Sequence, residues 1–409
     1  MSDSAGTTVR PPDPEEDAVR ASGADPPPPP REAPPATARA DRIGPARFAV
    51  IAIAFVVGAV SSVAWALSLD QGGHGRHLPS AAPAAHAGHV AGPASASASA
   101  SAAEPRGAGA YERYRRPDPT LPAVPPGRVK HFRVDVLMHR TKVADDRPAL
   151  RVWSFGVDGH FMRGTGVSPP MVVNQGDRVD ITFVNGANAA MHVDMAHSLD
   201  MHAAEVAPNV AFKTIPPGAR THYSFVARNP GVFMYHCATE PMVLHLGAGM
   251  VGMFVVKPRH MPKVDRELWL VQQEYFLPRA PGGDPDYAKM VAERPDVIAF
   301  NGYADQYVHH PIHVRAGERI RMYVLNPGPT HTSSFHVIGA VFDHTESEGV
   351  RGGPAQVMSL APSTGGYVDF TLRGEGAFPF VDHNFASMSR GAMGAMVTAH
   401  AAPDALSGF

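Results

Sequence analysis

Three histidines recur at five-residue intervals in the segment MHVDMAHSLDMH, which covers residues 191–202. They are His192, His197 and His202, and Asp194 and Asp200 lie between them. Imidazole is a common ligand of copper, zinc, iron and nickel, and both imidazole and carboxylate side chains can transfer protons. The segment therefore predicts a metal site, an acid–base site, or both.

The sequence contains one cysteine, Cys237, in the segment YHCATEP. A lone cysteine excludes an intramolecular disulfide, so its thiol is buried, reactive or bound to a metal. His245 and Met250 follow it with the spacing Cys-x7-His-x4-Met. With one further histidine from upstream, these side chains would form a blue-copper set of two imidazoles, a thiolate and a weak axial thioether. The simpler alternative is a buried thiol beside unrelated histidines and core methionines.

The positions of these side chains along the chain predict two metal sites rather than one. Adjacent side chains of a strand point to opposite faces, so His236 and Cys237 cannot serve the same side of a sheet. His197 and His202 are five residues apart, and in an extended chain they also face opposite sides. His192 then has no partner, and we expect it to be structural. The first predicted site contains His197, Cys237, His245 and Met250, and the second begins with His202 and His236.

Short apolar runs broken by Gly, Pro and Asn begin at Val129 and indicate an all-β fold. The expected strands are RVDITFVN, HYSFVA, GVFMYHC, GMFVVKP, RIRMYVLN, YVDFTLR and GAMVTAH, and DYAKMVAERP is the expected short helix. The segments VNQGDRVDITFVN (173–185) and VRAGERIRMYVLN (314–326) share one order of residue types. Two copies of one β-sandwich explain this repeat, with a first domain over 129–260 and a second over 261–400.

The chain before residue 129 predicts no folded domain. Residues 1–46 are proline-rich and poor in aliphatic side chains, which is typical of a disordered cytoplasmic tail. Residues 47–69 include the uncharged run FAVIAIAFVVGAVSSVAWALSL, close to the roughly 20 residues that a membrane-spanning helix needs. Arginines precede this run and Asp70 follows it, so the positive-inside rule places the later residues outside the cytoplasm. We expect a single-pass protein of the cell membrane with a low-complexity linker over 70–128, and a cleaved signal peptide is the alternative.

The overall charge gives little reason to expect a charged partner. The formal net charge is −2 over 409 residues, and no basic patch stands out. A nucleic-acid partner is therefore not expected, because binding to phosphates depends on clustered cationic side chains. The length is sufficient for two ordinary domains.

Four segments, HSLDMHAA, YHCATEPMVLHLGAGMVG, SSFHVIGAVFD and VDHNFASMSRGAMG, resemble in this order the copper-containing nitrite reductases, which have two cupredoxin domains. The resemblance covers about residues 129–400. It implies a homotrimer with two coppers per subunit, a type 1 copper in the first domain and a type 2 copper between subunits. His383 matches the third type 2 ligand, which the neighbouring subunit donates. Asp200 matches the proton-donating aspartate of the family, and His336 matches its active-site histidine.

The resemblance also implies a reaction, the one-electron reduction of nitrite to nitric oxide. An electron would come from a donor protein, either a small blue copper protein or a c-type cytochrome, and enter at the type 1 copper. It would pass through the adjacent residues Cys237 and His236 to the type 2 copper, where nitrite binds. Asp200 and His336 would then act as general acids, because the reaction consumes protons.

Three other functions remain open at this stage. A laccase-like multicopper oxidase acting on dioxygen needs His-x-His pairs, and the sequence contains none. A blue-copper electron carrier needs only the first copper, which leaves the second histidine set without a role. A different substrate is the third alternative. The segment EVAPNVAFKTIPP departs from the Gly-rich run that is common in the family, and Glu240 is unexpected beside the first copper loop.

Overall fold

The computed structural model describes residues 113–400 of the chain. The predicted tail (1–46), the predicted membrane span (47–69) and most of the predicted linker (70–128) lie outside the described residues. Among residues 113–400, no helix is long and apolar enough to cross a membrane. Strands make up most of the regular structure in this part of the chain, so the all-β prediction is confirmed for it.

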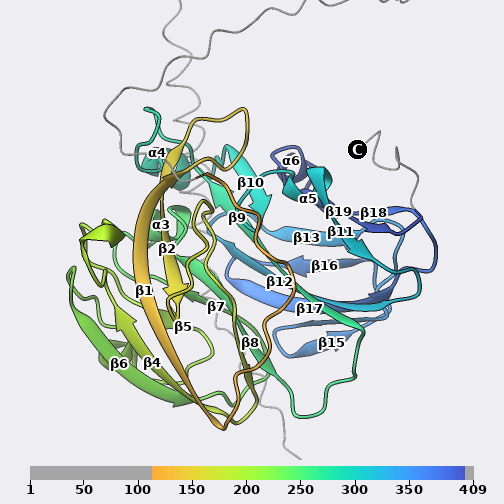
Figure 1. The fold of residues 1–409 in the computed structure, drawn as a ribbon, viewed down its shortest axis with the longest axis horizontal. Coiled ribbons are helices and arrows are strands. Elements are labelled where there is room, and N and C mark those ends of the chain that lie inside the picture. The colour runs from red at the N-terminus through yellow and green to blue at the C-terminus, as the bar shows by residue number, and fades with distance from the viewer. Residues whose placement is uncertain (1–112, 401–409) are drawn as a thin grey trace, which may run out of the picture. The chain divides into compact units, whose positions relative to one another are not determined.

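The first half of the described chain forms two four-stranded sheets that pack face to face (Figure 1). Their strands are β1 (Val129–Thr141), β2 (Leu150–Val157), β3 (Met171–Asn174), β4 (Arg178–Val184), β5 (Asp200–Met201), β6 (Arg220–Val226), β7 (Gly231–His236) and β8 (Val251–Lys257). One sheet has the order β2-β1-β4-β6 and the other β3-β8-β7-β5. Apolar side chains from both sheets fill the space between them, including Val134, Phe183 and Phe254.

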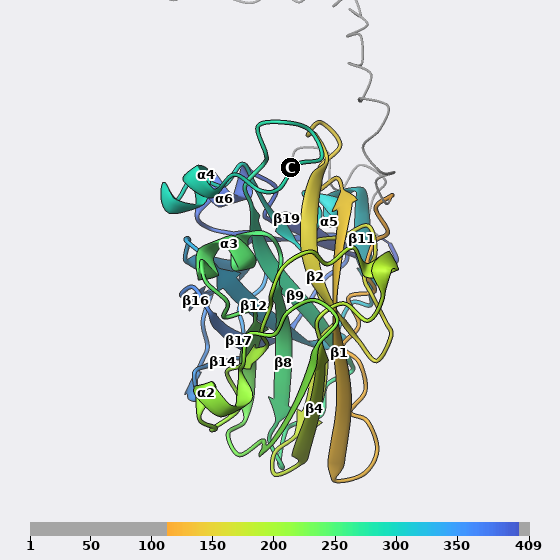
Figure 2. The same ribbon diagram turned by 90° about the vertical axis from the view of Figure 1, so that its left-hand side faces the viewer.

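The second half repeats this arrangement with larger sheets. Its strands are β9 (Arg266–Tyr275), β10 (Val297–Phe300), β11 (His310–Val314), β12 (Arg319–Gly328), β13 (Ser333–Val337), β14 (His344–Ser347), β15 (Val350–Gly352), β16 (Val357–Leu360), β17 (Thr364–Thr371), β18 (Ala377–Asp382) and β19 (Met393–Thr398). A six-stranded sheet, β10-β9-β12-β17-β14-β15, faces a five-stranded sheet, β11-β19-β18-β13-β16. A third apolar cluster joins the halves, with side chains from β7 and β8 of the first half and from β9, β12 and β17 of the second, and Figure 2 shows β8 and β12 close together in this region.

The sequence repeat corresponds to equivalent strands with equivalent end contacts. β4 pairs parallel with β1 and antiparallel with β6, and β12 pairs in the same way with β9 and β17. Asn185, which ends the first repeat, donates hydrogen bonds from Nδ2 to the carbonyls of Met195 and Ile215. Asn326, at the matching position, donates from Nδ2 to the carbonyls of His331 and Leu360. The repeated asparagine therefore ties the loop after each strand to the sandwich.

Helices are short and lie between strands. They are η1 (Ala189–Met191), α2 (Pro208–Ala211), α3 (Met242–Gly247), α4 (Tyr287–Val291), α5 (Gln306–His309) and α6 (Phe385–Met388). The predicted helix DYAKMVAERP corresponds to α4, and Asp286 caps it by accepting hydrogen bonds from the backbone N–H groups of Ala288 and Lys289. It ends early because Glu293 adopts a positive φ of 55° before Pro295. The seven predicted strands correspond to β4, β6, β7, β8, β12, β17 and β19, so these predictions are confirmed.

Candidate metal centres

Two consecutive residues at the end of β7, His236 and Cys237, direct their side chains to opposite sides of the sheet. Both His236 and Cys237 are buried, with 4% and 0% of their surface exposed. Cys237 belongs to the apolar core of the first sandwich. His236 instead approaches His202 and Asp200 on the other side of its sheet. The alternation of side chains along a strand thus places one potential metal ligand in each of two separate clusters.

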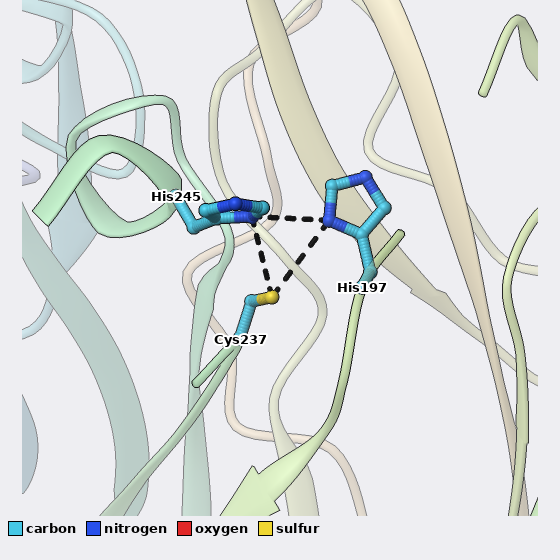
Figure 3. Close-up of side chains that lie close together, drawn as sticks. All are labelled: His197, Cys237 and His245. Atoms are coloured by element: carbon cyan, nitrogen blue, oxygen red, sulfur yellow. Dashed lines mark hydrogen bonds between the residues drawn. The ribbon is translucent and has the colours of Figure 1, made fainter. Parts of the chain in front are cut away.

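The first cluster consists of His197, Cys237 and His245 (Figure 3). The Nδ1 atoms of the two histidines are 3.1 Å apart. The Cys237 Sγ atom lies 3.3 Å from Nδ1 of His245 and 3.7 Å from Nδ1 of His197. Three potential ligand atoms therefore face one common point inside the sandwich.

Three different elements hold this cluster. His197 forms an isolated bridge with Ile215 through a pair of backbone hydrogen bonds. His245 lies in the last turn of α3. Met250 ends the loop, since its carbonyl accepts from the N–H of Cys237 and its own N–H donates to the carbonyl of His245. Met250 is fully buried in the same core as Cys237.

Burial keeps the histidines of the first cluster in the form that binds metals. Desolvation is the main reason that the pKa of His197 falls to about 3, and the neighbouring His245 lowers it further. Desolvation likewise lowers the pKa of His245 to about 4, although the carboxylate of Glu240 acts in the opposite direction. Both imidazoles are therefore neutral near pH ~7, with a ring nitrogen free to coordinate a metal.

Trp153 packs against both histidines of the first cluster. Its ring lies edge-on to His197 and His245, with centroid distances of 5.7 Å and 5.1 Å. The indole nitrogen of Trp153 donates to the carboxylate of Asp284, and its backbone N–H donates to the carbonyl of Ala248. The indole thus restricts how the two imidazoles can turn.

The second cluster consists of Asp200, His202 and His236. The short strand β5 pairs with β7 so that Asp200 lies directly opposite His236. The Nε2 atoms of His202 and His236 are 3.1 Å apart, and Asp200 Oδ2 is 3.8 Å from Nε2 of His236. Nδ1 of His236 lies 2.9 Å from the carbonyl oxygen of Cys237, which can only accept a hydrogen bond. His236 therefore carries its proton on Nδ1 and presents the lone pair of Nε2 to the cluster.

This second cluster is more open than the first. His202 is exposed, while Asp200 is half-buried. The residues around the His202 ring partly desolvate it, which lowers its pKa, and the neighbouring His236 lowers it further. Burial also lowers the pKa of His236. The arrangement provides two neutral imidazoles, a carboxylate and access from solvent, which suits a metal that binds a small ligand.

His336 and His383 lie together in the second sandwich. His336 is on β13 and His383 follows β18, and their rings stack with a centroid distance of 4.8 Å and an interplanar angle of 26°. Nδ1 of His336 contacts the carbonyl of Gln356. Within residues 113–400, the metal-capable group around His202 contains Asp200 and His236 but not His383. One copy of the chain therefore does not bring the predicted third type 2 ligand to the second cluster.

The buried carboxylate of Asp382 fixes the backbone around His383. Its Oδ1 accepts hydrogen bonds from the backbone N–H groups of Ser334 and Asn384, at 2.8 and 2.9 Å. Its Oδ2 accepts from the side-chain amide of Gln272 at 2.8 Å. The amide of Gln272 is buried, so it would be costly to leave without a partner. Asp382 therefore joins β13 to the residues on either side of His383.

Sequence reasoning did not find Trp153, Asp382 or Ser198, which contacts the sulfur of Cys237. Each of them contacts residues that are distant in the sequence, and none has a characteristic spacing from the predicted ligands. His192 belongs to neither cluster. It ends η1 in the left-handed conformation with φ of 53°.

Both donor sets suit copper. A thiolate, two imidazoles and a nearby methionine match a blue-copper site, and imidazoles alone are also good copper ligands.

The family model described as multicopper oxidase matches residues 152–261, which include both clusters. The copper-containing nitrite reductase of Neisseria gonorrhoeae is 33% identical over 290 residues, which cover 67% of this chain and 71% of that protein. The chain belongs to the copper-containing nitrite reductase family.

Solved structures of the nitrite reductase family share the fold. The structure of copper nitrite reductase from Nitrosomonas europaea aligns with a TM-score of 0.60 at 29% identity, covering 68% of this chain and 96% of that one. The copper-containing nitrite reductase of Thermus scotoductus aligns with a TM-score of 0.58 at 28% identity, covering 67% and 63% of the two chains. The predicted cupredoxin-like fold is therefore confirmed for the part of the chain that aligns with these nitrite reductases.

Proposed function

We propose that this protein reduces nitrite to nitric oxide with copper held at the two clusters described above. The membership of the copper-containing nitrite reductase family supports the activity. The observation that carries the proposal is the adjacency of His236 and Cys237. His236 is the last residue of β7 and belongs to the second cluster, and Cys237 follows it directly and belongs to the first. The balanced reaction is nitrite plus one electron plus two protons, giving nitric oxide and water.

Copper, when bound, supplies one-electron redox chemistry and, at the second centre, an open position for a small anion. The first centre is type 1, with His197, Cys237, His245 and Met250 as ligands. The apolar surroundings of Cys237 exclude water, and the loop from 237 to 250 holds the donors in place, so little rearrangement accompanies electron uptake.

The second centre is type 2 and begins with His202 and His236. The peptide bond between His236 and Cys237 would be the shortest covalent route for an electron between the two centres. The hydrogen bond from His236 Nδ1 to the Cys237 carbonyl would add a second route for the electron. Asp200, half-buried and 3.8 Å from Nε2 of His236, is placed to hold a proton beside a small anion bound there. It serves as a proton donor to nitrite.

The third imidazole of the second centre comes from a neighbouring copy of the chain, in a homotrimer. His383 and His336 lie together on the second sandwich, while Asp200 and His202 lie on the first. A heterologous interface joins unlike surfaces of identical subunits, and three such interfaces can close into a ring. In this arrangement His383 completes the donor set and His336 provides the second proton. The two halves of the active site then belong to the domains 129–260 and 261–400 of adjacent subunits.

The remaining parts of the proposal concern the cellular setting. The run from Phe48 to Leu69 anchors the protein in the cell membrane by a single helix, with the catalytic domains on the extracytoplasmic side. The electron comes from a small blue copper protein or a c-type cytochrome. The protein then acts in denitrification.

The activity is tested by supplying the copper-loaded, full-length protein with a reducing mediator and either nitrite or dioxygen. We expect nitric oxide release in proportion to copper content, measured with a nitric oxide electrode, and little oxygen uptake. The multicopper oxidase family model makes dioxygen the relevant competing substrate. Negligible nitrite turnover beside rapid oxygen uptake would assign the protein to the oxidase alternative.

Mixed trimers test whether the second centre is shared between subunits. We expect His202→Ala and His383→Ala to be nearly inactive when each is purified alone, because each removes one of three imidazoles from every second centre. When both chains are expressed together, some interfaces contain the native His202 and the native His383, so nitric oxide release should return in part. The measurement is activity per copper in the affinity-purified mixed oligomer. Failure of the mixture to exceed either parent would contradict the shared site.

A further inference from the structure

Ser198 is buried beside the first cluster and contacts the sulfur of Cys237 in two ways. Its exposed surface is 0%. Its backbone N–H donates to Cys237 Sγ over 3.4 Å, and its hydroxyl oxygen lies 3.8 Å from the same sulfur. The hydroxyl is therefore within reach of a weak hydrogen bond to the thiolate.

The other contacts of the Ser198 hydroxyl decide which way its proton points. Its Oγ accepts a hydrogen bond from the backbone N–H of Ala238 at 2.9 Å and another from the hydroxyl of Thr239 at 3.2 Å. A hydroxyl has two lone pairs and one proton, so both lone pairs are used. The proton is left for the sulfur, because a metal-bound thiolate has no proton to donate.

A chain of hydroxyls continues from Ser198 toward the surface. The hydroxyl of Thr239 lies 3.0 Å from that of exposed Thr214. Hydrogen bonds in such a chain polarise one another, so a donor to Ser198 strengthens the bond that Ser198 makes to sulfur. The effect of each hydroxyl on the sulfur should therefore decrease from Ser198 to Thr239 and become negligible at Thr214, which contacts only Thr239 in this chain of hydroxyls.

We propose that Ser198 is a positioning residue whose hydroxyl donates a second hydrogen bond to the Cys237 thiolate and raises the reduction potential of the first centre. The proposal rests on the proposed function, since it requires a copper–thiolate centre there. Electron uptake adds one negative charge to the centre, and a hydrogen-bond donor aimed at the sulfur stabilises the more negative state. The electron is supplied by the external donor protein.

The test compares Ser198→Ala with Thr239→Val and Thr214→Val in the full-length, copper-loaded protein. Ser198→Ala keeps the backbone N–H donor and removes only the hydroxyl. We expect it to disfavour reduction about threefold against a mediator of fixed potential, which is a fall of about 30 mV at 59 mV per tenfold. The visible thiolate-to-copper band should also shift. Thr239→Val should give a smaller fall in the same direction, and Thr214→Val, the matched control, should leave the potential unchanged.

A redox titration that is monitored through the visible thiolate-to-copper band distinguishes the outcomes. A wild-type protein without that band would contradict the proposed function. An intact band with the same potential in wild type and Ser198→Ala would overturn the role of Ser198. If Ser198→Ala does not load copper, because the N–H of Ala238 loses its acceptor, Thr239→Val decides. A wild-type potential in that variant would then overturn the proposal.

Discussion

Replacement of Cys237 by serine is expected to abolish the intense visible absorption of the copper-loaded protein and to reduce nitrite turnover to background. The band requires a thiolate, and serine is nearly the same size but offers a hydroxyl that stays protonated. The surrounding geometry should persist, since the two histidines of the first cluster are held by α3 and by the bridge to Ile215. The measurements are the visible spectrum and nitric oxide release with a mediator.

Two controls separate loss of the first centre from loss of the fold. His192→Gln changes a histidine of the same segment that belongs to neither cluster, so its spectrum and turnover should equal those of the wild type. In Cys237→Ser, copper at the second centre should remain, because His202 and His236 lie on the other side of the sheet. A Cys237→Ser protein that retains the visible band would show that the thiolate has been assigned wrongly.

Replacement of Asp200 by asparagine is expected to lower nitrite turnover on the order of 10², the usual contribution of one acid–base group. Asparagine keeps the size and part of the hydrogen bonding but cannot supply a proton. Copper content should be retained, because the proposed ligands of the second centre are imidazoles. His336→Gln should also lower turnover, because glutamine cannot supply a proton. Steady-state nitric oxide release and metal analysis on the same preparations measure these effects.

Asp194→Asn is the matched control for Asp200→Asn. Asp194 lies six residues earlier in the same segment and pairs with Arg151 over 2.7 Å, with 57% of its side chain exposed. An exposed ion pair contributes little to stability, so this variant should retain wild-type turnover. Equal losses in the two variants would indicate a general effect of charge rather than a proton donor at position 200. Full turnover in Asp200→Asn would exclude the carboxylate from the reaction.

The sequence could place His197, Cys237 and His245 in one cluster and His202 and His236 in another because these placements depend on rules that are local to the chain. Alternation along a strand separates His236 from Cys237, and the spacing to His245 follows the loop that returns from β7 through α3 to β8. The repeat that ends in Asn185 and Asn326 revealed the duplicated sandwich for a similar reason. Asparagine recurs because each of these loops is held by hydrogen bonds from an amide side chain to its backbone carbonyls.

Contacts that depend on strand pairing could not be predicted in the same way. Asp200 lies opposite His236 because the two-residue strand β5 pairs with β7 in one register, which no local pattern specifies. Trp153 reaches the first cluster from β2, in the opposite sheet. The predicted role of His383 depends on a second copy of the chain, and its place beside His336 follows from the pairing of β13 with β18.

The consecutive positions of His236 and Cys237 make both clusters depend on the length of β7. Insertion or deletion of one residue within this strand would exchange the faces of every side chain beyond it, so both donor sets would fail at once. A two-residue change would restore the faces but displace the ligands by roughly 7 Å along the sheet. A change in the length of the loop between Cys237 and His245 would disturb the first cluster only, because His245 does not belong to the second. Transfer of either cluster to another sandwich would therefore require the strand end that carries both His236 and Cys237.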